Sequence, residues 1–265
     1  MRAGRPIAPK PRTLEGCGVN GPFLTKLEHS GHTDVADRAA IASIVAHHRV
    51  VSARQDLSAE PGRSTVLVLL QGVMCRYRVM DGRSRRIASF VLPGDLCRLP
   101  EAPPKTSDWN IGALSRCAVG EIPIEALTAL ARERPNINRV LWWMTLNELA
   151  RAREWLVTGT MPAPQRTAHL FCELHACLQA AGLAEGGAFR LEIGQAALAD
   201  AVGLSTVHLN RTLRILREAG LACLSRGRVE IPDLAQLRAF ATFDGGYLGL
   251  NGPVARTGGA LHLGT

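Results

Sequence analysis

The most constraining part of this 265-residue chain is residues 191–231, where two short apolar patterns meet at a glycine. The inner face of a predicted first helix, opening near Gln195, carries Leu198, Ala199 and Val202. Gly203 follows where a tight turn needs a positive φ, which glycine adopts without steric cost. Ser205 is then a good N-cap for a second helix that runs to about Ala219. This pattern predicts a helix-turn-helix.

The second predicted helix has one apolar and one polar face. The apolar face packs on the first helix, where the small side chain of Ala199 allows a close approach, and it carries Leu209, Leu213 and Leu216 at spacings i, i+4 and i+7. The opposite face carries polar and basic side chains, namely Thr206, His208, Asn210, Arg211, Arg214 and Arg217. A helix with these two faces has one side free for a partner.

A basic hairpin follows Gly220: residues 222–231 are predicted to form two short strands with Arg226-Gly227-Arg228 at the tip. Five arginines and one acid, Glu218, lie between Ser205 and Arg228. This charge predicts binding to a polyanion, and the helix-turn-helix predicts insertion into a major groove. The alternative is that the pair binds nothing, as most amphipathic helix pairs joined at a glycine do. The spacing, the small residue at the crossing, the serine cap, the polar face and the basic hairpin together favour DNA binding.

Residues 163–236 resemble the C-terminal domain of the Crp/Fnr family of bacterial transcription regulators. The matching motifs are Gln195, Leu198-Ala199-Asp200, Gly203-Leu204-Ser205 and Val207-His208-Leu209-Asn210-Arg211. The chain departs from the family at Val207, where the best-known members carry a base-reading glutamate, and at Thr212, where an apolar residue is usual. The resemblance implies a winged helix-turn-helix domain over residues 162–236.

The length and the 46% share of apolar residues suit one large domain or two ordinary ones, and the net charge of +8 fits a polyanionic partner. No stretch reaches 18 uninterrupted apolar residues and the N-terminus lacks a signal-peptide core, so we expect a cytoplasmic protein without a membrane span. The seven cysteines include no CxxC pair. Iron–sulfur members of the family carry an N-terminal cysteine cluster, whereas that region here has only Cys17. We therefore expect no metal site and no cofactor.

The first half of the chain is predicted to hold an arm and a sensor domain. Residues 1–34 contain prolines, glycines and early basic residues, which predict a flexible basic arm. Residues 35–135 begin with a helical pattern over 35–48 and continue as short strand-like runs, with turns at Asp81-Gly82 and Pro93-Gly94-Asp95. Such strands predict an antiparallel roll or barrel. Their succession resembles the β-roll sensor domain of the same family.

The predicted effector pocket of the roll comprises Gly94, Asp95, Leu96, Lys105, Thr106 and Ser107. Family members that bind cyclic nucleotides hold the phosphate with a Gly-Glu pair, a short helix N-terminus and an Arg-Ser/Thr-Ala run. Here Asp95 replaces the glutamate, no such run follows, and three prolines between residues 100 and 104 would disrupt the helix. A cyclic nucleotide is therefore disfavoured, as is a haem at His47 or His48, which lack a supporting motif. The effector stays unidentified.

Residues 136–160 are predicted to form a long dimerisation helix and a hinge. One apolar stripe carries Trp142, Leu149, Ala152 and Leu156, and a second carries Val140, Leu141 and Met144. A helix with two apolar faces is covered on two sides. The family resemblance implies that it packs on its own roll and on a two-fold mate, giving a parallel homodimer; the alternative is a helix wholly inside one domain. At the end of the chain, the glycine-rich residues 245–265 are predicted to be disordered.

The predicted fold is thus α+β, with an N-terminal antiparallel, jelly-roll-like β-roll, a long dimerisation helix and a C-terminal winged helix-turn-helix. The predicted function is that of a homodimeric, sequence-specific transcription regulator that binds a near-palindromic site in double-stranded DNA and contacts RNA polymerase. The residues expected to contact DNA are Gln195, Ser205, Thr206, Val207, His208, Asn210, Arg211, Arg214, Arg226 and Arg228.

Within this set, Ser205, His208 and the two wing arginines are expected at phosphates, and Thr206, Val207, Asn210 and Arg211 at base edges. Two other functions can be compared with this one, of which the first, an enzyme, is nearly excluded. β-Rolls also host metal-dependent oxygenases, but these need two histidines and a carboxylate inside the roll, and residues 60–125 contain no histidine. The second is an effector-free DNA-binding or interaction protein, in which the roll only dimerises or contacts RNA polymerase.

Overall fold

The computed structural model describes residues 21–57, 64–80, 84–98 and 109–250. Its helices and antiparallel sheets confirm the α+β class. The elements in chain order are α1 (Gly21–His29), α2 (Val35–Ile44), β1 (His47–Val51), β2 (Thr65–Gln71), β3 (Met74–Met80), β4 (Ser84–Val91), β5 (Leu96–Arg98), β6 (Asn110–Ala113), β7 (Cys117–Pro123), α3 (Ile124–Glu133), α4 (Pro135–Thr158), α5 (Ala163–Ala180), β8 (Ala184–Glu185), β9 (Ala188–Arg190), α6 (Gln195–Ala201), α7 (Thr206–Glu218), β10 (Cys223–Ser225), β11 (Arg228–Glu230), α8 (Leu234–Phe240) and the 3₁₀ helix η1 (Gly245–Leu248).

The N-terminal half is a roll of two antiparallel sheets, with strand orders β1-β7-β2-β5 and β4-β3-β6. The β2 segment is apolar at nearly every position because both of its faces are covered. Leu67 and Leu69 face the interior of the roll, whereas Val66, Val68 and Leu70 pack toward the surrounding helices. This alternation follows from the two-residue period of a strand.

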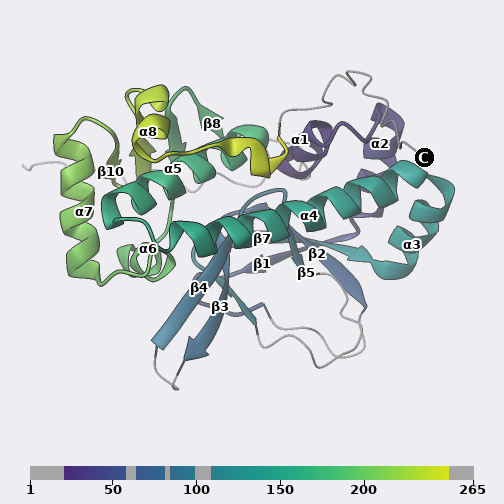
Figure 1. Cartoon of the computed structure of the whole chain (residues 1–265). Coiled ribbons are helices and arrows are strands. Elements are labelled where there is room, and N and C mark those ends of the chain that lie inside the picture. Colours follow the sequence, from purple (N-terminus) through teal and green to yellow (C-terminus); the bar gives the residue numbers. More distant parts are fainter. Residues whose placement is uncertain (1–20, 58–63, 81–83, 99–108, 251–265) are drawn as a thin grey trace, which may run out of the picture.

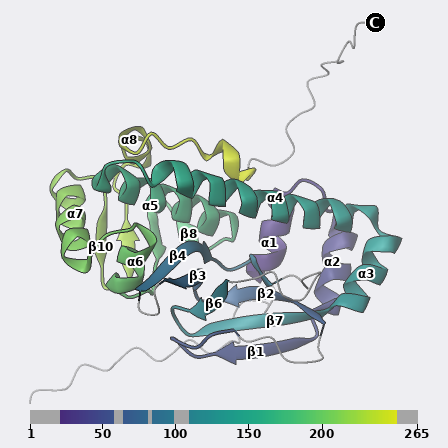
Figure 2. The same ribbon diagram turned by 60° about the horizontal axis from the view of Figure 1, so that its bottom comes forward.

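Helix α4 extends along most of the length of the molecule (Figures 1 and 2). In Figures 1 and 2 it runs from α3 at one end, across the roll, to the α6–α7 pair at the other end. The side chains of Val140 and Met144 on one of its faces are buried against the roll helices. The second apolar stripe of α4, described below, does not share this environment.

The C-terminal half is built on α5, which is buried along most of its length. Helices α7 and α8 and the small sheet β10-β11-β9-β8 pack around it. Its core continues into the roll, since Phe171 of α5 and Phe90 of β4 belong to one buried cluster and neither is exposed to solvent. Strands β8 and β9 were not predicted from the sequence, because segments of two and three residues carry no measurable alternation.

The prediction of a flexible arm over residues 1–34 is wrong for its described part. Residues 21–29 form α1, in which Phe23 and Leu27 lie one turn apart and are buried at 3% and 0% exposure. Lys26, on the same buried side, forms an ion pair with Asp95 of the roll. The basic, glycine-containing composition predicted a solvated segment, but one apolar pair and one buried ion pair attach it to the sheet. Residues 1–20 lie outside the described part.

Two further boundaries differ from the predictions. The helix expected over residues 35–48 ends at Ile44, and His47–Val51 forms β1, which pairs antiparallel with β7. The tail expected to be disordered from residue 245 begins instead with η1, whose Leu248 is 1% exposed. The indole Nε1 of Trp143 on α4 donates to the carbonyl of Gly249, 3.3 Å away. The packing of these few apolar side chains outweighs the glycine-rich composition; residues 251–265 lie outside the described part.

Candidate nucleic-acid interface

Helices α6 and α7 form a helix-turn-helix. Gly203 in the turn has φ +63°, and the side chain of Ser205 accepts a hydrogen bond from the backbone N–H of His208 at 3.2 Å. The apolar sides of the two helices meet through Leu198 and Leu209, which are almost fully buried. These contacts confirm the turn and the N-cap that the sequence predicts, and they fix which face of α7 points outward.

The outward face of α7 contains the residues that we expected to contact DNA. All ten members of that predicted set are exposed: Gln195, Ser205, Thr206, Val207, His208, Asn210, Arg211, Arg214, Arg226 and Arg228. Five of them, Gln195, Val207, Asn210, Arg211 and Arg214, line one open groove of about 530 Å³ beside α7. The structure thus brings together residues from both helices, while Ser205, Thr206 and His208 lie at the start of α7.

The arginines along this face differ in how they are held. Arg214 is 3.8 Å from Glu218 one turn later, and Arg228 is 3.1 Å from Glu230 on the wing. All four of these side chains are more than half exposed, so such pairs contribute little to stability. Within the described ranges, Arg211 makes no ion pair. Arg217, which lines the same groove, makes none there either, so these two arginines of α7 can turn toward a ligand without breaking an ion pair.

The wing is the β-hairpin formed by β10 and β11, and its turn has two residues. Strands β10 and β11 pair from Cys223↔Glu230 to Ser225↔Arg228, which leaves residues 226 and 227 as the turn. Both turn residues have positive φ, +49° for Arg226 and +72° for Gly227, as a type I′ hairpin requires. A left-handed arginine is costly in a turn where glycine or asparagine is usual. Its guanidinium is nevertheless held at the exposed tip, beside α7.

Thr212, which departs from the apolar residue usual in the family, is 1% exposed on the inner side of α7. Its methyl group can pack in this position as an apolar residue would. Leu216 and Leu209 on either side of it are fully buried, so the helix keeps its apolar contact surface. The departure at Thr212 leaves the helix-turn-helix intact.

Three residues of the predicted effector pocket, Gly94, Asp95 and Leu96, lie in the described part of the chain, where their neighbours are other residues of the protein. Gly94 has φ +91°, and a Cβ there would lie 2.9 Å from the carbonyl oxygen of Pro22. The carboxylate of Asp95 is engaged by Lys26 and by Arg151, 3.1 Å away, and also accepts from the backbone N–H of Leu92. Leu96 is buried in the apolar core. The three residues form a packed junction with α1 and α4; Lys105, Thr106 and Ser107 lie outside the described residues.

Burial alone would raise the pKa of the Asp95 carboxyl, but the positive charges of Lys26 and Arg151 outweigh it and lower the pKa to about 2. The group is therefore ionised and internally paired at neutral pH. A carboxylate that already accepts from three donors is poorly placed to recruit a ligand.

The stripe predicted for dimerisation on α4 lies on its solvent side. Trp142, Leu149 and Leu156 are 66%, 44% and 76% exposed, and Ala152 is exposed as well. Leu146 and Val157, which the sequence analysis did not single out, are also exposed on this helix. The stripe extends over four turns, so α4 carries an apolar surface that the described part of the chain leaves uncovered.

Other polar residues of importance were not predicted. Arg85 of β4 is 3.3 Å from Asp200 of α6, which connects the roll to the helix-turn-helix. Arg151 and Glu173 are buried within otherwise apolar helix faces, at 7% and 0% exposure. A charged residue at a core-facing position is a signal that the sequence contained. Its partners could not be inferred, because for Arg151 and Glu173 they lie up to 74 residues away along the chain.

Two other kinds of site are absent from the described ranges. No group of three or more His, Cys, Asp or Glu side chains there is arranged to hold a metal ion. None of the helices described is long and apolar enough to cross a lipid bilayer.

Comparison with known proteins agrees with this architecture. Residues 165–240 match the Crp-like helix-turn-helix domain. The chain is 26% identical over 178 residues to the transcriptional activator protein anr of Pseudomonas aeruginosa, covering 67% of this chain and 72% of that protein. It is 28% identical over 183 residues to the nitrogen fixation regulation protein FixK of Azorhizobium caulinodans, covering 65% and 70%.

A solved structure shares the fold. FixK2 from Bradyrhizobium japonicum superposes with a TM-score of 0.62 at 20% identity, over 75% of this chain and 98% of that one. The family match covers the helix-turn-helix and its flanking elements, the relatives match about two thirds of the chain, and the geometry of α6 and α7 agrees with both. Residues 165–240 are a Crp-like helix-turn-helix domain, and the chain as a whole is similar to DNA-binding transcription regulators of the Crp/Fnr type.

Proposed function

We propose that this regulator acts as a homodimer on a near-palindromic site, with α7 of each protomer inserted into the major groove. The observation that carries the proposal is the exposed face of α7, where Arg211, Asn210 and Val207 line one groove beside the basic wing. An α-helix fits the major groove, where each base pair shows a distinct pattern of donors, acceptors and methyl groups.

The residues divide by the atoms that they can reach. Arg211, free of an ion pair among the described residues, suits a bidentate contact with guanine, and Asn210 suits adenine. Ser205 and His208 at the start of α7 suit a phosphate, because the unpaired N–H groups of a helix N-terminus attract anions. Arg226 and Arg228 on the wing suit phosphates along the flanking backbone. Gln195, Thr206 and Arg214 complete the interface.

Dimerisation follows from α4. A continuous apolar stripe from Trp142 to Leu156 is unusual on a free surface and fits a second copy of the same helix. A two-fold axis along this seam would present two α7 helices to one face of a duplex. The two half-sites should then be separated by about one helical turn, roughly 34 Å.

The cellular role follows from this binding mode. We place the protein in the cytoplasm with its DNA target, assign it no catalytic step, and expect the bound dimer to contact RNA polymerase. The named relatives anr and FixK, a transcriptional activator and a regulation protein, support such a role. The roll would respond to an effector that is not yet identified.

A second candidate is a regulator without an effector. Within the described residues, apolar side chains fill the space between the two sheets of the roll, and Leu69, Met74, Val91, Cys97 and Val119 are each at most 1% exposed. This packing favours a roll that serves as a scaffold. Thermal unfolding with and without candidate small molecules separates the two: a saturable rise in Tm supports sensing, and DNA binding at full affinity without any addition supports the scaffold.

The test of the proposed function is selection of binding sites from random duplex DNA with the purified protein at near-physiological salt. The expected result is a palindrome with half-sites one turn apart. An Arg211→Ala variant should lose one base preference, while Arg132→Ala, an exposed arginine on α3, should select the same sequence as the wild type. Sequence-blind, strongly salt-dependent binding by the wild type would contradict the proposal.

A further inference from the structure

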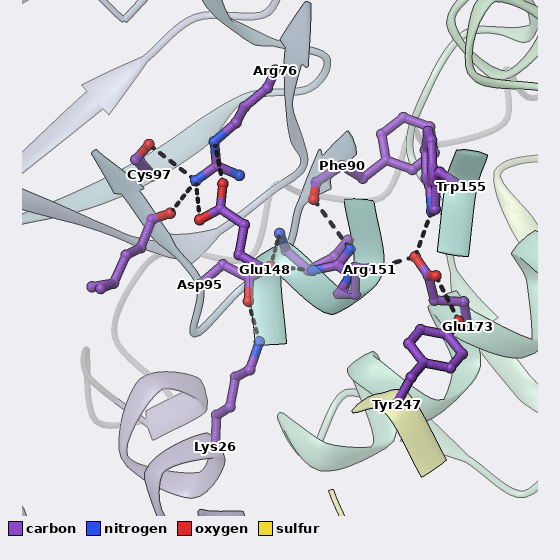
Figure 3. Close-up of polar contacts among 12 residues, drawn as sticks. Lys26, Arg76, Phe90, Asp95, Cys97, Glu148, Arg151, Trp155, Glu173 and Tyr247 are labelled. Atoms are coloured by element: carbon purple, nitrogen blue, oxygen red, sulfur yellow. Dashed lines mark hydrogen bonds and ion pairs between the residues drawn. The ribbon is translucent and has the colours of Figure 1, made fainter. Parts of the chain in front are cut away.

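A chain of buried and half-buried polar side chains joins the roll to the DNA-binding half. Figure 3 shows Lys26, Asp95, Arg151 and Glu173 in succession, with Tyr247 at the far end. The five residues come from five separate parts of the fold: α1, the turn between β4 and β5, α4, α5 and η1. They meet in the C-terminal third of α4, and none of them lies on α7.

Arg151 is the centre of this chain. Its Nε is 3.4 Å from Oε1 of Glu173 on α5, and its NH1 donates to Oδ2 of Asp95 at 3.1 Å. Its NH2 donates to the carbonyl of Phe90 at 3.2 Å. One planar guanidinium thus contacts the strand β4, the turn after it and the first helix of the DNA-binding half. Because these donors have a fixed mutual geometry, the contacts specify an angle as well as a distance.

Glu173 is held from three sides. Besides Arg151, the indole N–H of Trp155 donates to Oε1 at 3.0 Å, and the hydroxyl of Tyr247 donates to Oε2 at 2.7 Å. Burial and the neighbouring Glu173 raise the pKa of Tyr247 well above its usual range, so the hydroxyl keeps its proton and remains a donor. Both carboxylate oxygens therefore have partners from α4 and η1, and α5 cannot slide along α4 without breaking them.

The environment makes such breakage costly. Glu173 is fully buried and Arg151 is 7% exposed, and the cavity beside Lys26, Asp95 and Arg151 measures only about 30 Å³. That volume admits a water molecule or two and no larger group. A displaced charge would therefore find little solvent, and removing one partner of a buried pair leaves the other uncompensated.

These contacts matter because the covalent connection is short. Residues 159–162 are the sole link in the chain between α4 and α5, so non-covalent contacts must set the angle between them. We infer that Arg151 is a positioning residue: through Glu173 and Tyr247 it fixes the DNA-binding half on α4 and thereby sets the half-site spacing that the dimer accepts. This inference rests on the proposed two-fold binding mode.

The experiment measures affinity for a series of duplexes rather than for one. The selected palindrome is made with its half-sites at the selected spacing and at one or two base pairs more or fewer, together with a duplex that carries a single half-site. For the wild type, a wrong spacing should cost on the order of tenfold or more in Kd, the scale of a mismatched base pair.

Three variants are compared in the full-length protein. Arg151→Met removes the three donors, Tyr247→Phe removes only the hydroxyl, and Arg132→Met is the control, an exposed arginine on α3 outside the apolar stripe of α4. We expect Arg151→Met to bind the single half-site within about twofold of the wild type but to lose most of its spacing preference. Tyr247→Phe should show a partial loss, and it keeps the test valid if Arg151→Met fails to fold. The control should retain the wild-type profile.

The outcomes separate the inference from the proposed function. Folded variants of Arg151 and Tyr247 that keep the wild-type spacing profile would overturn the inference, as would an equal loss of affinity for every duplex including the half-site. A wild-type protein that selects a base sequence but ignores spacing would overturn the dimeric arrangement, and this inference with it. A flattened profile with an unchanged half-site affinity supports both.

Discussion

Val207 carries the largest exposed apolar surface on α7, at 81% exposure, between the polar side chains of Thr206 and His208. On an ordinary surface a single exposed valine needs no explanation. Here it lines the groove that also contains Asn210 and Arg211. The apolar group that a base edge offers in the major groove is the C5-methyl of thymine. Val207 therefore suits a thymine, where a glutamate in the same position would accept from cytosine.

We predict that uracil in place of the thymine facing Val207 lowers affinity about fourfold, because a buried methyl group contributes about 0.8 kcal/mol. The measurement is a competition titration with two selected operators that differ only in that methyl. A Val207→Ala variant should bind the two operators with similar affinity. If the variant distinguishes them as well as the wild type does, another residue contacts the methyl.

Replacing Arg211 should change which base is preferred, whereas replacing Arg228 should change the affinity for DNA of any sequence. Arg211→Ala should cost about 1–3 kcal/mol on the selected operator and relax preference at one position, since the arginine reads a base. Arg228→Ala should weaken binding to all sequences alike and reduce the salt slope by about one, because it contacts a phosphate. Titrations on operator and random duplexes at several salt concentrations measure both effects. Equal losses on both duplexes for both variants would contradict this division.

At the scale of the element, α4 is a helix with two different environments. One side is buried on the roll through Val140 and Met144, and the other exposes Trp142, Leu149 and Leu156. At 1.5 Å per residue its 24 residues extend about 36 Å, long enough to act as the seam of a dimer and as the support of both halves. The charged Arg151 lies on the buried side with Met144, seven residues earlier, where an apolar residue would make no oriented contact.

We predict that Leu149→Glu converts the dimer into monomers. A two-fold seam places the change on both protomers, and each lost leucine contact costs about 1.5–3 kcal/mol, so the dimer Kd should rise at least a hundredfold. Sedimentation velocity over a concentration series measures it. Val35→Glu is the control, since Val35 is 74% exposed on α2, outside the stripe. A Leu149→Glu protein that sediments as the wild type does would place the dimer contact elsewhere.

At the scale of the whole molecule, the two halves share one buried core and several polar contacts across their junction. Phe90 of the roll packs in the same cluster as Phe171 of α5, and the rings of Phe90 and Trp155 meet edge to face at 5.7 Å. The Arg85–Asp200 pair and the Arg151–Glu173 pair tie β4 and α4 to the DNA-binding half. The roll and the helix-turn-helix should therefore respond together to a perturbation of their junction.

Lowering the pH should weaken that junction, because the ion pairs of Asp95 need its ionised carboxylate. Its pKa is lowered to about 2 in the folded protein, so its pairing stabilises the fold fully above the ordinary carboxyl pKa near 4 and loses effect as pH falls toward 2. The contribution is about 2 kcal/mol. Urea unfolding of the wild type and of Asp95→Asn between pH 5 and pH 2 should show the difference in unfolding free energy shrinking by that amount. A difference independent of pH would mean that Asp95 is not ionised in the folded state.

The sequence alone determined the elements whose information is local. Gly203, Ser205 and the leucine spacing define α6, the turn and α7, because caps, turns and helix periodicity act within a few residues. The exposed face of α7 and the two apolar sides of α4 follow from the same periodicity. The α+β class and the roll could be predicted from strand lengths and turn residues for the same reason.

Only the tertiary structure decided which distant groups meet. Helix α1 and η1 have compositions that favour solvent, yet Leu27 and Leu248 are buried because surfaces formed elsewhere in the chain receive them. The position of Asp95 between Lys26 and Arg151 likewise turns an expected ligand contact into an internal ion pair. Burial and ion pairing depend on contacts between residues that are tens of positions apart, so local periodicity cannot specify them. The same long-range contacts set the angle between the two halves of this regulator.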